Sequence, residues 1–119
     1  MIKRKKYLYH VTHKDNVPFI LKDGLKNHSQ GRMRFAIYLS EKPLSWYTGD
    51  DDIAILKVNI SDLKIEMTTF LPAIDEVLVW GDISPYIETK KGAISRFEDV
   101  TDKYAATKKH LKTNNKERF

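Results

Sequence analysis

Cysteine is absent from this 119-residue sequence. Without a thiol the chain can form no disulfide, no thiolate metal site and no cysteine nucleophile. Long hydrophobic runs are absent too, since none approaches the roughly 20 apolar residues that a membrane-spanning helix needs. The basic opening MIKRKK is followed by polar residues too soon for a signal peptide, so we expect a cytoplasmic protein without membrane contact.

Metal and phosphate motifs are also missing from the sequence. Glycine occurs five times and forms no glycine-rich phosphate loop, and no HExxH pattern is present. His10 and His13 are three positions apart at a strand end and would point to different faces, so we expect no metal site. The composition that remains, 41% hydrophobic with 11% aromatic residues, is that of one globular domain with one core.

Positive charge is concentrated at the two ends of the chain. Residues 1–6 and 101–119 each carry a formal charge of +4, so the net +5 leaves −3 for residues 7–100. Basic ends of this kind can contact nucleic acid or an acidic protein. A solvated tail explains the same charges.

Hydrophobic periodicity predicts an α+β sheet protein with one early helix. Strands are expected at residues 6–12, 35–40, 53–60, 63–67, 76–80 and 83–94. In 53–60, alternation places the even-numbered residues, from Ala54 to Ile60, on one face. In the first strand it places His10 and Thr12 on the same face.

The early helix has recognisable start and stop residues. Asp15 or Asn16 can cap it, Pro18 is tolerated in its first turn, and Gly24 supplies a left-handed stop. Phe19, Ile20 and Leu21 are expected to pack against the core. Leu25 is the apolar residue that usually follows such a stop.

Less regular segments complete the prediction. Residues 26–34 and 68–74 are expected to be loops, and residues 41–47 one helical turn capped by Ser40. Trp46 and Tyr47, in that turn, could form an aromatic platform for a ligand, but we expect them in the core. From Arg96 onward the pattern predicts a helix that ends in a disordered tail, which divides the chain into a domain at 1–95 and a basic helix or tail at 96–119.

Three stretches occur in an order that resembles a known family. They are YHVTHKDNVPFILKDGL at residues 9–25, FAIYLS at 35–40 and IDEVLVWGDISPYI at 74–87. Together they closely resemble the motifs of the ADP-ribosyltransferase fold, in the version found in DNA-modifying toxins of toxin–antitoxin pairs. The resemblance implies two small, mainly antiparallel sheets around a nucleotide cleft, with NAD as substrate and no metal.

The resemblance also implies a His-Tyr-Glu triad, formed here by His10, Tyr38 and Glu76. In that reading His10 bonds the adenosine ribose, Tyr38 stacks on nicotinamide, and Glu76 bonds the 2′-hydroxyl of the nicotinamide ribose. A carboxylate suits this place because positive charge develops on the ribose as the glycosidic bond breaks. Read singly, His10 is an ordinary half-buried histidine, Tyr38 a packing residue and Glu76 a solvated strand end.

Further positions follow from the same resemblance. Thr12 and Asn16 would help to bind NAD, as would Arg34, for which Arg32 is an alternative. Ile74 stands where arginine-modifying relatives have a glutamate, which disfavours arginine as the acceptor.

The acceptor would be recognised by the segment before Glu76. Phe70, Leu71 and Pro72 could present an aromatic and apolar surface there, or fold inward. The segment between Tyr38 and Glu76, residues 39–75, is short and leaves little room for a large acceptor-binding insertion.

We therefore expect an ADP-ribosyltransferase that transfers ADP-ribose from NAD to a nucleic acid or protein, such as a toxin or effector of a phage or mobile element. A non-catalytic nucleotide- or partner-binding module is the alternative, and in it Glu76 would be replaceable. Plain NAD hydrolysis remains open. The tRNA 2′-phosphotransferase reaction would require a set of arginines around a 2′-phosphate, and no convincing set is present.

Overall fold

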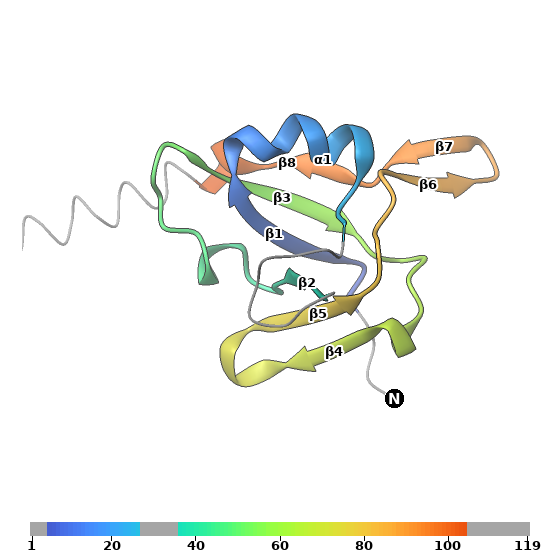
Figure 1. Cartoon of the computed structure of the whole chain (residues 1–119), viewed down its shortest axis with the longest axis horizontal. Coiled ribbons are helices and arrows are strands. Elements are labelled where there is room, and N and C mark those ends of the chain that lie inside the picture. The colour runs from blue at the N-terminus through green and yellow to red at the C-terminus, as the bar shows by residue number, and fades with distance from the viewer. Residues whose placement is uncertain (1–4, 27–35, 105–119) are drawn as a thin grey trace, which may run out of the picture.

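In the part of the chain that the structure describes, small antiparallel sheets and one helix build an α+β fold (Figure 1). We describe a computed structural model, which covers residues 5–26 and 36–104. The strands are β1 (Tyr7–His13), β2 (Ala36–Leu39), β3 (Ile53–Asn59), β4 (Thr68–Leu71), β5 (Glu76–Trp80), β6 (Tyr86–Thr89), β7 (Gly92–Ser95) and β8 (Phe97–Asp99). The helix is α1 (Val17–Asp23), and single 3-10 turns lie at Lys14–Asn16, Pro43–Ser45, Ile65–Met67 and Pro72–Ile74.

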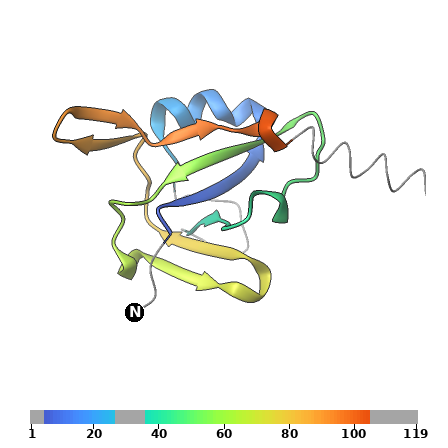
Figure 2. The same cartoon turned by 180° about the vertical axis from the view of Figure 1, so that it is seen from behind.

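The strands form two three-stranded sheets and a separate hairpin. Sheet 1 has the order β1-β3-β8, sheet 2 has the order β2-β5-β4, and β6 pairs with β7. Every pairing is antiparallel. The hairpin projects from the body of the molecule in both views, while the two sheets lie one above the other (Figures 1 and 2).

The two sheets are joined by an isolated bridge between Tyr9 and Ser40. The backbone N–H of each residue donates to the carbonyl oxygen of the other, and both N–O distances are 2.8 Å. Tyr9 lies in β1, and Ser40 directly follows β2. The sheets therefore meet along one seam, and the first strands of both reach it.

The main core fills the space between sheet 1, sheet 2 and α1. It is formed by Leu8, Val17, Ile20, Leu25, Ile37, Leu39, Ala54, Leu56, Val58, Ile60, Val77, Val79, Ile83 and Phe97. The even-numbered residues of β3 all belong to it, which confirms the predicted alternation. Burying each large aliphatic side chain contributes about 1.5–3 kcal/mol.

The opposite face of sheet 1 is also covered. Ile55 is fully buried there with Tyr47 and Val100, and Tyr9 packs against them. The rings of Tyr9 and Tyr104 meet edge to face with centroids 6.3 Å apart. Because both faces of sheet 1 are buried, side chains pack against both sides of β1 near the seam.

Helix α1 ends where the sequence predicts. Gly24 has φ of 80°, and a Cβ added to it would overlap the carbonyl oxygen of Ile83. Leu25, which is buried, pairs with Ile83 through two N–H···O bonds of 2.8 Å. Asn16 precedes the helix without a side-chain capping bond, and Pro18 lies in the first turn as expected.

The predicted packing of α1 is only partly correct. Val17 and Ile20 are buried, whereas Phe19 is 68% exposed and Leu21 is 39% exposed. With seven residues, the helix turns only a narrow stripe toward the core. The expectation that Phe19 and Leu21 pack inward is therefore wrong.

Four secondary-structure predictions need correction. Residues 63–67 contain the 3-10 turn Ile65–Met67 in place of a strand, and the predicted loop at 68–74 contains β4. Residues 83–94 hold most of a hairpin, because the chain reverses between Thr89 and Gly92. The helical turn at 41–47 is a single 3-10 turn, Pro43–Ser45, preceded by Lys42 and not capped by Ser40.

The helix predicted from Arg96 onward is wrong for its first residues. Phe97–Asp99 is a strand that pairs with β3 in the register Val58↔Phe97, and Phe97 is buried. Helical backbone begins only at residue 101. Pairing with the open edge of β3 outweighs the helical periodicity, and the rest of the predicted helix and tail, residues 105–119, lies outside the described residues.

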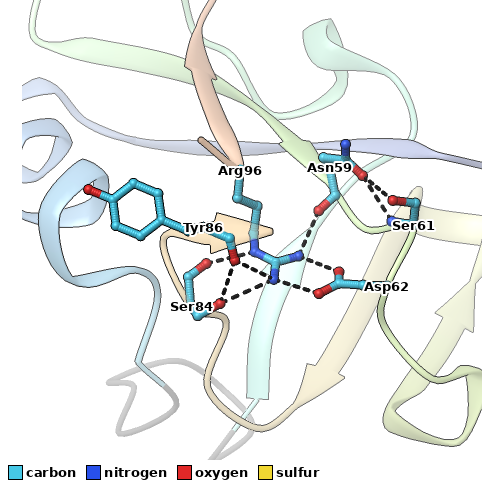
Figure 3. A network of polar contacts seen from close by, with 6 residues as sticks. All are labelled: Asn59, Ser61, Asp62, Ser84, Tyr86 and Arg96. Atoms are coloured by element: carbon cyan, nitrogen blue, oxygen red, sulfur yellow. Dashed lines mark hydrogen bonds and ion pairs between the residues drawn. The ribbon is translucent and has the colours of Figure 1, made fainter. Parts of the chain in front are cut away.

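A buried arginine ties the hairpin to sheet 1 (Figure 3). The Arg96 side chain is 2% exposed and forms a bidentate ion pair with Asp62, at 2.6 and 2.9 Å. It also donates to the carbonyl oxygens of Asn59, at 2.9 Å, and Ser84, at 2.6 Å. The guanidinium is thus surrounded by acceptors from two segments of the chain, residues 59–62 and 84–86, as a buried charge requires.

Candidate functional site

A cleft of about 400 Å³ lies at the seam between the two sheets. It is lined by Tyr9, His10, Val11, Tyr38, Leu39, Ser40, Trp46 and Glu76. These residues come from β1, from β2 and the segment after it, and from the first position of β5. The three residues of the predicted triad, His10, Tyr38 and Glu76, are thus brought to one cavity from three strands.

His10 is fixed by the backbone of the opposite sheet. Its Nδ1 lies 2.9 Å from the carbonyl oxygen of Tyr38. A carbonyl only accepts, so Nδ1 carries the proton and donates. Burial lowers the pKa of His10 below 6.5, although the hydrogen bond to Tyr38 raises it. The imidazole is therefore neutral at pH 7, and its Nε2 can serve as a hydrogen-bond acceptor.

Tyr38 and Glu76 project from the same face of sheet 2. Tyr38 pairs with Leu78, and Glu76 precedes Leu78 by two residues on β5. Side chains two apart on a strand share a face, so Glu76 is the diagonal neighbour of Tyr38, about 7–8 Å away. The strand register, which no local sequence pattern reveals, brings the aromatic ring and the carboxylate together.

Glu76 is a buried residue, with an exposed fraction of 2%. The reading of Glu76 as a solvated strand end is therefore wrong. Directly opposite it in the ladder is Leu71 of β4. A buried carboxylate at the wall of a cavity interacts strongly with a cation placed beside it, because water screens the interaction poorly there.

Trp46 is a wall residue of the cleft, so the expectation that it lies in the core is wrong and the alternative, an exposed platform, holds. It is 46% exposed, whereas its neighbour Tyr47 is buried as predicted. The indole Nε1 of Trp46 donates to the backbone carbonyl of Asp75 at 3.0 Å. An exposed tryptophan with a fixed ring beside a cavity is suited to stack on a planar ligand.

Asp75 anchors the segment that carries Trp46. Its carboxylate accepts the backbone N–H of Glu41 at 2.9 Å and that of Lys42 at 3.0 Å. Asp75 itself has left-handed backbone angles, φ 48° and ψ 61°. Sequence reasoning missed this residue because its partners are 29 to 34 positions away, and no local pattern links them.

The remaining predicted binding residues lie apart from the lining. Asn16 donates from Nδ2 to Oγ1 of Thr12 at 3.0 Å, and neither residue lines the cleft. Arg34 and Arg32, together with most of the predicted loop at 26–34, lie outside the described residues.

The predicted acceptor residues lie on β4 and in the turn after it. Leu71 is opposite Glu76 and shares its face of sheet 2, whereas Phe70 is opposite Val77 and points to the other face. Phe70 and Leu71 belong to β4 and are 52% and 37% exposed, and Pro72 begins the 3-10 turn that follows. Among the described residues β4 is an edge strand of sheet 2, and none of their strands pairs with its outer side. Of the two readings left open for these side chains, the exposed one holds for Phe70 and Leu71.

No protein-family model matches the chain, and no curated protein matches its sequence. Within residues 5–26 and 36–104, no group of three or more histidine or acidic side chains could hold a metal ion. Nor do these residues contain a helix long and apolar enough to cross a membrane.

Proposed function

We propose that the cleft binds NAD and that the protein is an ADP-ribosyltransferase with the fold of that family. The observation that carries the proposal is the convergence of His10, Tyr38 and Glu76 on one cavity. These are the residues that the motif resemblance selects, and a three-strand arrangement brings them together. A volume of about 400 Å³ accommodates the nicotinamide ribose half of the dinucleotide.

Each group has a defined part in this reaction. Tyr38 and Trp46 offer aromatic surfaces to the nicotinamide ring, whose positive charge favours a π face. The unprotonated Nε2 of His10 accepts a hydrogen bond from a ribose hydroxyl. The carboxylate of Glu76 bonds the 2′-hydroxyl of the nicotinamide ribose.

The reaction breaks the bond between C1′ of the ribose and the nicotinamide nitrogen. The bonding electrons leave with nicotinamide, which becomes neutral, and positive charge develops on the ribose. Glu76 stabilises this charge more strongly in the transition state than in the bound substrate. A nucleophilic atom of the acceptor then bonds to C1′ and releases its proton to the solvent.

The acceptor is a nucleic acid or protein that reaches Glu76 along β4. Leu71 is directly opposite Glu76 and shares its face of sheet 2, whereas Phe70 is opposite Val77 and points to the other face. Both side chains are exposed and could pack against a base or an apolar side chain at this edge of the sheet. The basic ends of the chain, residues 1–6 and 101–119, would attract an acidic partner, and raising the salt concentration should weaken that contact.

The test is nicotinamide release from NAD by the purified protein, alone and with added DNA, RNA or cell lysate. Glu76→Gln and Glu76→Ala should lower release by about 10²–10³-fold, as expected for a group that acts in the transition state. Glu88→Gln is the matched control, because Glu88 is exposed on the hairpin and should leave release unchanged. The additive that stimulates release identifies the acceptor class.

Other outcomes separate the alternatives. Release without any additive, with no label on macromolecules, identifies plain hydrolysis. If neither the wild type nor Glu76→Ala releases nicotinamide while NAD still binds, the protein is a nucleotide-binding module. For 2′-phosphotransfer, Arg96 offers no support, because its guanidinium is committed to Asp62 and backbone carbonyls.

A further inference from the structure

One residue joins Trp46 and Glu76, which line the cleft, to residues 41 and 42, which precede Trp46 in the chain. The carboxylate of Asp75 bonds the chain at Glu41 and Lys42, its carbonyl accepts the indole of Trp46, and its peptide continues directly into Glu76. We infer that Asp75 is a positioning residue, which sets the place of the Trp46 ring relative to the Glu76 carboxylate and so determines how tightly the cleft holds a planar ligand.

The backbone of Asp75 makes this double role possible. At φ 48° and ψ 61° the residue lies in the left-handed region, where glycine, asparagine and aspartate are the residues tolerated most readily. The side chain bonds residues 41 and 42 while the carbonyl of the same residue receives the indole N–H. A β-branched residue could not adopt this conformation without strain.

The carboxylate is matched to its two donors. Glu41 and Lys42 present successive backbone N–H groups, one to each carboxylate oxygen, at 2.9 and 3.0 Å. Successive N–H groups form a concavity that favours an anion, and charged acceptors make stronger bonds than neutral ones. An amide has only one oxygen, so asparagine would satisfy one donor and place its own N–H₂ against the other.

These bonds fix both ends of the wall segment. Residues 41 and 42 lie at its start, and Trp46 lies at its end, beyond the 3-10 turn Pro43–Ser45. Both ends are bonded to Asp75, so the segment cannot shift without breaking contacts to this residue. Loss of the carboxylate should therefore free the indole to move, even though Trp46 itself is unchanged.

The inference rests on the proposed function only for the identity of the ligand, NAD. The position of Trp46 can be measured without any ligand. In a Trp80→Phe background Trp46 is the sole tryptophan, since the chain contains two. Acrylamide quenching and the emission maximum then report on the Trp46 ring alone.

Three variants in this background separate the carboxylate from the backbone conformation. Asp75→Asn keeps the tolerance for the left-handed region and loses one acceptor. Asp75→Gly keeps the conformation and loses both acceptors, whereas Asp75→Ala also adds backbone strain. Asp99→Asn is the control, because Asp99 accepts the backbone N–H of Thr101 at 3.0 Å but does not line the cleft.

We expect acrylamide to quench Trp46 more steeply, and its emission to shift to the red, in Asp75→Asn and Asp75→Gly. The dissociation constant for NAD should rise about tenfold, as for the loss of one charge-assisted hydrogen bond. Asp99→Asn should change neither quantity. The variants are compared under conditions where circular dichroism shows each of them to be folded. If the alanine variant does not fold, the quenching and NAD affinity of the asparagine variant test the inference.

The inference is overturned if Asp75→Asn and Asp75→Gly quench as the parent does. It is likewise overturned if quenching rises while NAD affinity is unchanged. If the parent binds no NAD at all, the quenching result still decides whether Asp75 positions Trp46. In that case the proposed function is contradicted, and the positioning role of Asp75 is tested by the quenching measurement alone.

Discussion

Nδ1 of His10 donates a hydrogen bond to the carbonyl oxygen of Tyr38 over 2.9 Å. His10 belongs to sheet 1 and Tyr38 to sheet 2, so this bond crosses the seam next to the Tyr9–Ser40 bridge. The imidazole therefore has two tasks. It joins the two sheets through one nitrogen and leaves the other available to a ligand.

The pH dependence of stability should reflect this histidine. Burial lowers the pKa of His10 below 6.5, the ordinary value that it regains in the unfolded chain. The unfolded state then binds a proton more readily than the folded state does. Stability should be complete above about pH 6.5 and fall as the pH drops from there toward the lowered pKa.

Urea unfolding between pH 7.5 and pH 5 would measure this effect, with His10→Gln as the comparison. The glutamine variant lacks the titrating group and should lose less stability over the same interval. Equal slopes for the two proteins would show that His10 does not control acid sensitivity.

Tyr38 should contribute to ligand binding through its ring. Tyr38→Phe keeps the aromatic face and should retain NAD affinity within about threefold, whereas Tyr38→Ala should lower it about tenfold or more, the magnitude of a lost stacking contact. Calorimetric titration with NAD would measure both. A larger loss in the phenylalanine variant than in the alanine variant would contradict a stacking role.

Arg96 should be essential for stability. Arg96→Met removes the partner of Asp62 and the donors to the carbonyl oxygens of Asn59 and Ser84, and should cost about 3 kcal/mol. The free energy of unfolding in urea measures this change. Adding Asp62→Leu should recover part of the loss, since the carboxylate that faced the guanidinium is then gone as well. No recovery in the double variant would place the cost in the lost carbonyl contacts.

Gly24→Ala should be destabilising through backbone strain and through steric overlap. Comparison with Gly92→Ala separates the two effects. Gly24 and Gly92 both have positive φ, 80° and 112°, but only a Cβ at Gly24 would overlap the carbonyl of Ile83. Gly92→Ala should cost about 1–2 kcal/mol from backbone strain alone. Gly24→Ala should cost more, because the Leu25–Ile83 pairing must also shift. Equal thermal unfolding of the two variants would contradict this account.

Local sequence patterns were sufficient for the most regular elements. β5 has the predicted bounds, Glu76–Trp80, and β3 alternates as predicted, because period-two burial depends on neighbouring residues alone. The specific ADP-ribosyltransferase fold stays a prediction. Patterns failed where a distant partner decides the structure. Phe97–Asp99 became a strand by pairing with β3, and β4 formed on the open edge of β5.

The same distinction applies to the site. His10, Tyr38 and Glu76 could be selected from motifs, but their meeting depends on the Tyr38↔Leu78 register and on the seam between sheets. Asp75 could not be selected, and Trp46 was only a possible platform that the core reading outweighed. Their roles depend on hydrogen bonds that join residues 41, 42 and 46 to residue 75, and nothing near either segment signals them.

The division of the cleft between two sheets has a thermodynamic consequence. His10 is carried by sheet 1 and Glu76 by sheet 2, so a molecule that contacts both holds together two units that must separate when the protein unfolds. Any such molecule raises the melting temperature in proportion to the logarithm of its concentration above its dissociation constant. Heating the protein with a panel of small compounds would therefore rank ligands of the cleft without requiring that any of them react.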